Sequence, residues 1–218
     1  MSEREIELRA DGIRLAGRLG MPAGDARGLV IFAHGSGSGR QSPRNRFVAA
    51  SLKDAGFTTL LLDLLTADEE QIDNRSGELR FDIGLLARRM VDATVWARAQ
   101  PEIASLPVGY FGASTGAAAA LVASAQRKDI AAIVSRGGRP DLAGDALESV
   151  AAPVLLIVGS RDPVVLNLNR AAASRLKSCE LAVVSGATHL FEEPGALEEV
   201  TALAQQWFAA HLPESGAP

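Results

Sequence analysis

The chain has 218 residues, of which 47% are hydrophobic, so it is long and apolar enough to bury a sizeable core. Its formal net charge of −4 is modest and no long block of like charge occurs, which argues against nucleic acid or an anionic membrane as a partner. A single cysteine, Cys179, excludes a disulfide framework and a cysteine-rich metal site, and we expect a reducing, cytoplasmic location.

Alternating apolar residues on both sides of Asp11-Gly12 predict an N-terminal β-hairpin over 6–8 and 13–16. Apolar runs and helical patterns then alternate to the end of the chain. The predicted strands cover 28–33, 57–63, 108–111, 130–135, 153–159 and 181–185. The predicted helices cover 43–55, 79–98, the Ala-rich segment after Ser114, 141–150, 168–177 and 194–212, and 66–78 is predicted to be a polar loop.

Strands that alternate with helices need crossover connections, which predicts an α/β fold. We expect a mostly parallel sheet with helices on both faces and the hairpin as an antiparallel edge. Residues 1–212 are predicted to form one domain, followed by a disordered tail at 213–218. The charged N-terminus has no apolar signal segment. The uncharged stretch 107–126 is better explained by a strand, a turn and a buried helix than by a membrane span.

The segment Gly112-Ala-Ser-Thr-Gly116 stands between a predicted strand and a predicted helix. This is the context of the Gly-x-Ser-x-Gly turn that exposes a nucleophilic serine at a helix N-terminus. There the helix dipole and the free N–H groups favour developing negative charge. We therefore interpret Ser114 as a nucleophile, the alternative being a serine that only caps the helix.

A serine hydroxyl needs a base that takes its proton, and the base needs an acid that orients it. His189 follows the last predicted strand and is the preferred base, because His34 comes too early in the chain and His211 ends the last helix. Asp162 follows the strand before it and is the preferred acid. The alternatives are that His189 is a structural histidine and that Asp162 only forms an ordinary Asp-Pro turn. Asp141 and Asp145 are weaker candidates for the orienting acid.

The glycine-rich loop His34-Gly-Ser-Gly-Ser-Gly39 follows the strand over 28–33. Glycines free its backbone to aim N–H groups at an oxyanion, and we expect the donors to be the N–H groups of Ser36 and Thr115. His34 is expected to brace the loop. A phosphate-binding turn is the alternative, but the loop lacks the Lys-Ser/Thr ending of a P-loop.

The motifs HGSGSG, GASTG, GSRDPV and GATHLF, in this order, resemble those of the α/β-hydrolases over nearly the whole chain. The chain looks most like the small dienelactone-hydrolase-like proteins, and HGSGSGRQSPRNR, SRGGRPDL and GATHLFEEPGALE resemble a bacterial subgroup sometimes fused to a phosphoribosyltransferase domain. Dienelactone hydrolases use a cysteine nucleophile, whereas this turn carries Ser114, and Cys179 is expected near the end of a helix. The dienelactone activity is therefore not carried over, and a serine with a histidine and an aspartate looks more like an esterase or thioesterase. The short segment between 135 and 153 leaves no room for a lid domain, which implies an open site and small substrates.

Several arginines gather at the predicted catalytic edge, and a guanidinium suits a carboxylate or a phosphate. The candidate substrate-binding residues are His34, Arg40, Arg136 and Arg139. They indicate a small-molecule ester that carries an anionic group. The alternative is that these arginines pair with nearby carboxylates and pin the loops.

The sequence thus predicts a serine hydrolase that acts on small carboxylic esters or thioesters without a metal or an organic cofactor. A non-catalytic binding module with this fold, and a lyase or acyltransferase with the same three residues, remain open. The amphipathic last helix also leaves open a homodimer.

Overall fold

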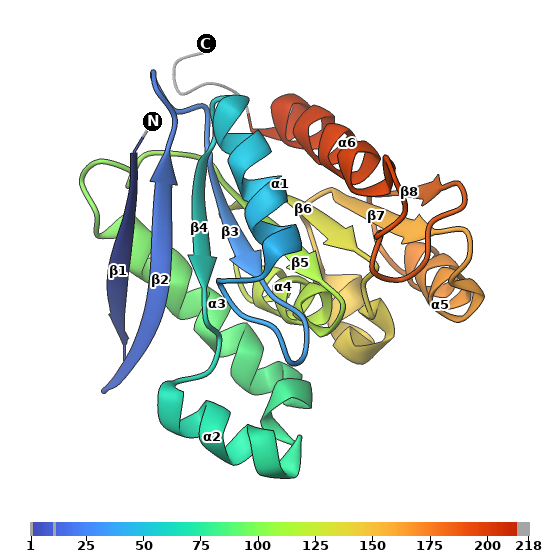
Figure 1. Ribbon diagram of the computed structural model, residues 1–218, viewed down its shortest axis with the longest axis horizontal. Helices are drawn as coiled ribbons and strands as arrows, with labels where there is room; N and C mark the ends of the chain where they lie inside the picture. Colours follow the sequence, from blue (N-terminus) through green and yellow to red (C-terminus); the bar gives the residue numbers. More distant parts are fainter. Residues whose placement is uncertain (1, 11, 213–218) are drawn as a thin grey trace.

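The computed structural model describes residues 2–10 and 12–212, which form a sheet with helices on both faces (Figure 1). Within this part of the chain the sheet has eight strands in the order β1-β2-β4-β3-β5-β6-β7-β8. The strands are β1 (Ser2–Ala10), β2 (Ile13–Met21), β3 (Leu29–Ala33), β4 (Thr58–Leu62), β5 (Val108–Ala113), β6 (Ile130–Arg136), β7 (Val154–Gly159) and β8 (Cys179–Val184).

In the order of the sheet, all neighbouring strands from β4 to β8, with β3 among them, pair in parallel, as the alternation of strands and helices predicts. Every residue of β3, β4, β5 and β7 is buried, because helices cover both sides of these central strands. This explains why they read as continuous apolar runs in the sequence. The predicted mostly parallel sheet is confirmed.

The N-terminal hairpin is also confirmed, since β1 and β2 pair antiparallel and β2 joins β4 antiparallel. Its strands are longer than predicted. Polar residues of β1 extend the pairing along the exposed edge of the sheet, where no apolar signal is needed. Gly12 has a φ of 79°, while Asp11 lies outside the described residues.

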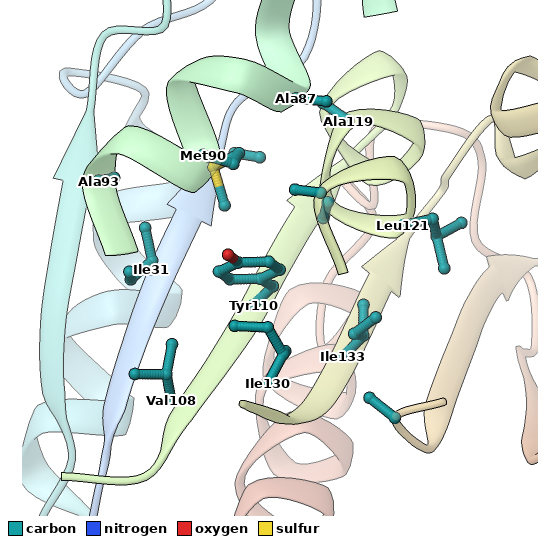
Figure 2. Close-up of a cluster of buried hydrophobic side chains, with 14 of the residues drawn as sticks. Ile31, Ala87, Met90, Ala93, Val108, Tyr110, Ala119, Leu121, Ile130 and Ile133 are labelled. Carbon is teal, nitrogen blue, oxygen red and sulfur yellow. The ribbon is translucent and has the colours of Figure 1, made fainter. Parts of the chain in front are cut away.

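Two helix layers enclose the sheet. The helices α1 (Pro43–Asp54) and α6 (Ala196–His211) pack on one face, and α3 (Ile83–Arg98), α4 (Thr115–Ala125) and α5 (Pro163–Ala173) pack on the other. Figure 2 shows part of the core between the sheet and the layer of α3, α4 and α5, with Tyr110 below Met90 of α3 and beside Ile31 of β3. The Tyr110 hydroxyl lies 2.6 Å from Thr94 Oγ1, and burial raises its pKa to about 12.

Residues 66–78 are not the polar loop that the sequence predicts, because they contain the helix α2 (Ala67–Ser76). Thr66 Oγ1 accepts the N–H of Glu69, whose carboxylate accepts the N–H of Thr66, and Gly77 ends the helix at a φ of 70°. This reciprocal cap stabilises a short helix that has almost no apolar face. Figure 1 shows α2 beyond the carboxyl end of β4.

Three further helix predictions need correction. The helix expected over 79–98 is divided at Asp82, which caps α3 and leaves a separate 3₁₀ turn, η1 (Leu79–Phe81). The segment expected as a helix over 141–150 is the 3₁₀ segment η2 (Pro140–Ser149), interrupted by Gly144 at a φ of 55°. The helix expected over 168–177 begins earlier, because Asp162 caps α5 and Pro163 takes its first position.

Between β6 and β7, residues 137–153 contain η2 and turns but no inserted lid domain. Across the described residues, no helix combines the length and the apolar character that a membrane crossing requires. The predicted disordered tail at 213–218 lies outside the described residues.

Candidate active site

Ser114 occupies the sharp turn between β5 and α4, with φ 50° and ψ −121°. A non-glycine residue adopts this conformation only under strain. The flanking glycines are required by space, because a Cβ on Gly116 would lie 2.3 Å from the Ala33 oxygen and one on Gly112 would lie 2.4 Å from the Ala117 Cα. The chain therefore crosses tightly over β3 and presents Ser114 at the start of a helix.

Backbone hydrogen bonds to the last residue of β6 and from the loop after it hold this strained residue on both sides. The Ser114 N–H donates to the Arg136 oxygen at 3.2 Å, and the Arg139 N–H donates to the Ser114 oxygen at 3.1 Å. The same loop is tied to α5, because the fully buried Asn169 donates its amide to the Gly138 oxygen at 2.9 Å. No feature of the sequence marked Asn169, since its partner is a backbone atom distant in the chain.

His189 and Asp162 come together at the carboxyl ends of β8 and β7. His189 Nδ1 lies 2.7 Å from Asp162 Oδ2, while Asp162 Oδ1 accepts the N–H of Val165 and caps α5. The side chain of Asp162 is 15% exposed and that of His189 is 38% exposed. A hydrogen bond from Nδ1 to the carboxylate leaves Nε2 of His189 free to accept a proton.

The loop that carries His189 is itself braced. The Thr188 N–H donates to the Glu193 carboxylate at 3.1 Å, and this interaction holds the pKa of Glu193 below its usual range. Phe191 is buried with a φ of 55°, a strained conformation that its packing against the α1–α6 face maintains.

One pocket, here called the catalytic pocket, contains the predicted nucleophile and the predicted base. Ser114 and His189 both line it, although the described residues show no hydrogen bond between their side chains. In an unliganded site such bonds are often long and shorten when substrate binds. The other lining residues are Gly35, Ser36, Ser38, Ser42, Arg44, Ala113, Arg136 and Leu190.

The glycine-rich loop after β3 approaches the nucleophile closely. A Cβ on Gly35 would lie 3.1 Å from Ser114 Cβ, and Gly37 takes a φ of 66° in a turn closed by the Ser38 N–H and the Gly35 oxygen. Within the described residues, the N–H groups of Ser36 and Thr115 donate to no protein acceptor. Both donors thus remain available to an oxygen atom bound beside Ser114.

His34 braces this loop. Its Nδ1 lies 3.0 Å from the Gly35 oxygen, and its Nε2 accepts the Leu64 N–H at 3.0 Å. This pair of contacts fixes the neutral tautomer with the proton on Nδ1. Loss of solvation lowers the pKa of His34, partly offset by the Gly35 oxygen and Asp63.

Arg136 is the candidate substrate-binding arginine that the structure brings beside Ser114 and His189. It is 8% exposed, and its Nη1 has no hydrogen-bond partner among the described residues. Its Nη2 donates only to the Asn45 side chain, at 3.3 Å. Burial, with a smaller contribution from nearby Arg44, lowers the pKa of Arg136 to about 10.

Arg40 and Arg139 are not brought into the catalytic pocket. Arg40 pairs with Asp63 and with Glu5, and Arg139 donates two hydrogen bonds to Asp141 at 2.8 and 2.7 Å. These pairs fit the alternative that the arginines pin loops.

Cys179 does not lie near the end of a helix, because it is the first residue of β8, and burial raises the pKa of its thiol to about 11.

The family model described as "Dienelactone hydrolase family" matches residues 15–211. This chain belongs to the dienelactone hydrolase family. The crystal structure of a dienelactone hydrolase from Anabaena variabilis is 53% identical to it, with a TM-score of 0.94 over 96% of this chain and 98% of the other.

More distant structures share the fold of this dienelactone hydrolase family member. Est1E from Butyrivibrio proteoclasticus is 18% identical, with a TM-score of 0.80 over 95% of this chain and 98% of its own. An alpha-beta serine hydrolase homologue from Coxiella burnetii is 18% identical, with a TM-score of 0.77 over 94% of this chain and 97% of its own. The fold is that of the α/β-hydrolases, and membership of the dienelactone hydrolase family supports hydrolase activity.

A curated relative from Mycobacterium tuberculosis, provisionally named a phosphoribosyl transferase, is 58% identical over 214 residues. The match covers 97% of this chain but 47% of the relative, so the chain spans about half of that protein's length. The name of the whole relative is therefore not transferred to this chain.

Proposed function

We propose that this chain is a serine hydrolase that cleaves small carboxylic esters or thioesters through an acyl-enzyme on Ser114. The observation that carries the proposal is the strained Ser114 at the N-terminus of α4, in one pocket with a histidine that is bonded to a carboxylate. Strain of this kind persists where the surrounding structure enforces it, and it is concentrated at functional sites.

In the first half of the reaction, His189 Nε2 takes the proton of the Ser114 hydroxyl as the oxygen attacks the carbonyl carbon. The carbonyl oxygen becomes an oxyanion and accepts hydrogen bonds from the N–H groups of Ser36 and Thr115. Asp162 holds the imidazole in the required tautomer and stabilises the imidazolium. The imidazolium then protonates the leaving oxygen or sulfur as its bond to the carbonyl carbon breaks, so that an alcohol or thiol departs and the acyl group stays on Ser114.

In the second half, His189 takes a proton from water, and the resulting hydroxide attacks the acyl carbon. The second oxyanion collapses and releases the acid, and His189 returns the proton to Ser114 Oγ. Each step moves one proton between named atoms, so the scheme is complete without a metal or an organic cofactor.

The surroundings of Arg136 support the proposal that the substrate carries an anionic group close to the scissile bond. A buried guanidinium without a carboxylate partner is unfavourable in the free protein. An anionic group in the catalytic pocket would supply the missing counter-charge, and Arg44, which pairs with exposed Glu192 at 3.0 Å, faces the same pocket. We therefore include carboxylate- or phosphate-bearing esters and thioesters in the proposed substrate class.

Replacement of the nucleophile tests this proposal. The Ser114 side chain makes no capping hydrogen bond to α4, so Ser114→Ala should leave the unfolding transition nearly unchanged. Hydrolysis of phenyl acetate should fall by a factor on the order of 10⁵ or more, because the acyl-enzyme cannot form. A folded variant that keeps the activity of the wild type would contradict the proposal. Acyl transfer to an added alcohol in place of water would indicate an acyltransferase.

A further inference from the structure

We propose that a second pocket, on the side of the glycine-rich loop away from His189, binds an uncharged, hydroxyl-bearing acyl group of the substrate. The proposal rests on the function proposed above. This "α2 pocket" is lined by residues of the loop after β3, of the α2–η1 segment and of the start of α4. The side chains that matter to the argument are Ser36, Ser38, Glu70, Asn74, Arg80 and Thr115.

The position of the α2 pocket identifies the part of the substrate that it receives. It shares Gly35, Ser36 and Ser38 with the catalytic pocket, and it also includes Thr115, whose N–H we assign to the oxyanion. His189 lines only the catalytic pocket of the two. Because the leaving group must receive a proton from His189, it occupies the catalytic pocket, and the acyl chain extends towards the α2 pocket.

A fixed donor faces this pocket. The backbone N–H and Nε of Arg80 donate to the two carboxylate oxygens of Asp73 at 2.9 and 2.7 Å, and Nη2 donates to the Asp73 carbonyl. These bonds outweigh the opposing effect of burial and hold the pKa of Asp73 below its usual range. Nη1 has no protein acceptor among the described residues, and it is the nearest atom, at 3.7 Å, to the place of a Cβ on Gly37.

Acceptors lie around the same space. Within the described residues, the side chains of Glu70 and Asn74 line the pocket and make no hydrogen bond. Thr115 is 2% exposed, and its Oγ1 is buried without a partner. By contrast, His34 and Asp63, which also line the pocket, already use their polar atoms in contacts with Gly35, Leu64 and Arg40.

The mixture of donors and acceptors selects the ligand chemistry. A carboxylate or phosphate would meet the carboxylate of Glu70, and an ammonium group would meet the Nη1 end of the Arg80 guanidinium. A hydroxyl group both donates and accepts, so it suits a pocket that is lined by a donor such as Arg80 Nη1 and by acceptors such as Glu70 and Asn74. The two pockets therefore differ in what they bind: an anionic group beside Arg136 and neutral hydroxyl groups beside α2.

The test compares two esters that differ only in hydroxyl groups, ethyl 3,4-dihydroxybutanoate and ethyl butanoate. We expect the wild type to have at least a tenfold higher kcat/KM for the dihydroxy ester, because a site built to hydrogen-bond a hydroxyl rejects a substrate that lacks it. Asn74→Leu should reduce this ratio severalfold. Asn74 is exposed on α2, so the variant is expected to fold. Asn167→Leu, the same change at an exposed position of α5, should keep the ratio.

Equal kcat/KM values for the two esters in the wild type would overturn the assignment of the α2 pocket but not the proposed hydrolase. An unchanged ratio in Asn74→Leu, or an equal loss in Asn167→Leu, would also overturn it. A folded wild type that hydrolyses neither ester and does not react with a fluorophosphonate would overturn the proposed function and this inference together.

Discussion

At the scale of single residues, the site combines a strained serine with an uncompensated cation. The backbone at Ser114 is held by the Arg136 oxygen and the Arg139 N–H, so the end of β6 and the loop after it position the serine, and the same end of β6 carries the guanidinium of Arg136. Such a site is organised before substrate binds, which is the condition for effective electrostatic stabilisation of a transition state.

Arg136 should cost stability in the free protein and favour an anionic substrate. Arg136→Met should raise the melting temperature of the ligand-free protein by a few degrees, because it removes a buried charge that has no carboxylate partner in the described part of the chain. The same variant should lower the kcat/KM ratio for 3-acetoxybenzoate over phenyl acetate by about tenfold or more, since the anionic ester loses its counter-charge. Calorimetry and steady-state hydrolysis measure the two effects.

Arg46→Met provides the control for Arg136→Met, because Arg46 is exposed on α1 and does not line the catalytic pocket. It should change neither quantity appreciably. If Arg136→Met kept the preference for the anionic ester, Arg136 would not be the anion-binding residue.

The positions of Ser114, Asp162 and His189 after three different strands could be predicted, because turn motifs and the carboxyl ends of parallel strands are visible in the sequence. The different surroundings of Arg40, Arg136 and Arg139 could not. Whether an arginine pairs with a carboxylate depends on side chains that folding brings together, and Arg136 meets Asn45 across 91 residues of chain.

At the scale of secondary structure, glycines set how closely the elements approach. Gly116, the second residue of α4, lies against the carbonyl oxygens of Ala33 and His34, so the first turn of α4 can pack close to the end of β3. Here the backbone of the loop after β3 comes within reach of Ser114. The geometry of the proposed oxyanion site thus depends on a residue without a Cβ at position 116.

We predict that Gly116→Ala destabilises the protein by about 1–3 kcal/mol, because its Cβ would lie 2.3 and 2.4 Å from two backbone oxygens that cannot move independently. Gly24→Ala is the matched control, with no atom within 4 Å of its Cβ. Urea denaturation of both variants measures the difference. A Gly116→Ala variant as stable as Gly24→Ala would show that the close approach is not rigid.

Elements with an apolar face could be predicted, whereas those held by caps were missed or displaced. The helix α2 has a Thr66–Glu69 capping box and the helix α5 has Asp162 before Pro163, and both signals are present in the sequence. The spacing of apolar residues alone predicts a loop over 66–78 in place of α2 and a start for α5 that is too late. The capping residues were the more reliable guide at these two places.

At the scale of the whole molecule, the sheet brings the loops that follow its parallel strands to one edge, and His34 links two of them. It connects the loop after β3 to the backbone of Leu64 after β4 through its neutral ring. Protonation of the ring would remove the acceptor that Leu64 uses and would place a charge where solvation is poor.

This gives a pH dependence of stability. The pKa of His34 is lower in the folded protein than in the unfolded chain, so the unfolded state binds more protons as the pH falls. The contribution of His34 is therefore fully present above pH 6.5, its ordinary value, and is lost as the pH falls below it. Urea denaturation at pH 7.5 and pH 5 should show lower stability at pH 5.

His34→Gln should reduce this difference between pH 7.5 and pH 5, because glutamine does not titrate. The comparison with the wild type removes the contributions of carboxylates, whose titration both proteins share. An identical pH dependence in the two proteins would mean that His34 does not link protonation to folding.

The central claim is that Ser114 is activated by His189. The most direct measurement is mass spectrometry of the intact protein after treatment with a fluorophosphonate, followed by mapping of the adduct. We predict one adduct, on Ser114, whose formation is slowed by at least about a hundredfold in His189→Ala. A folded wild-type protein that forms no adduct, or an adduct on Ser114 that forms equally fast in His189→Ala, would contradict the claim.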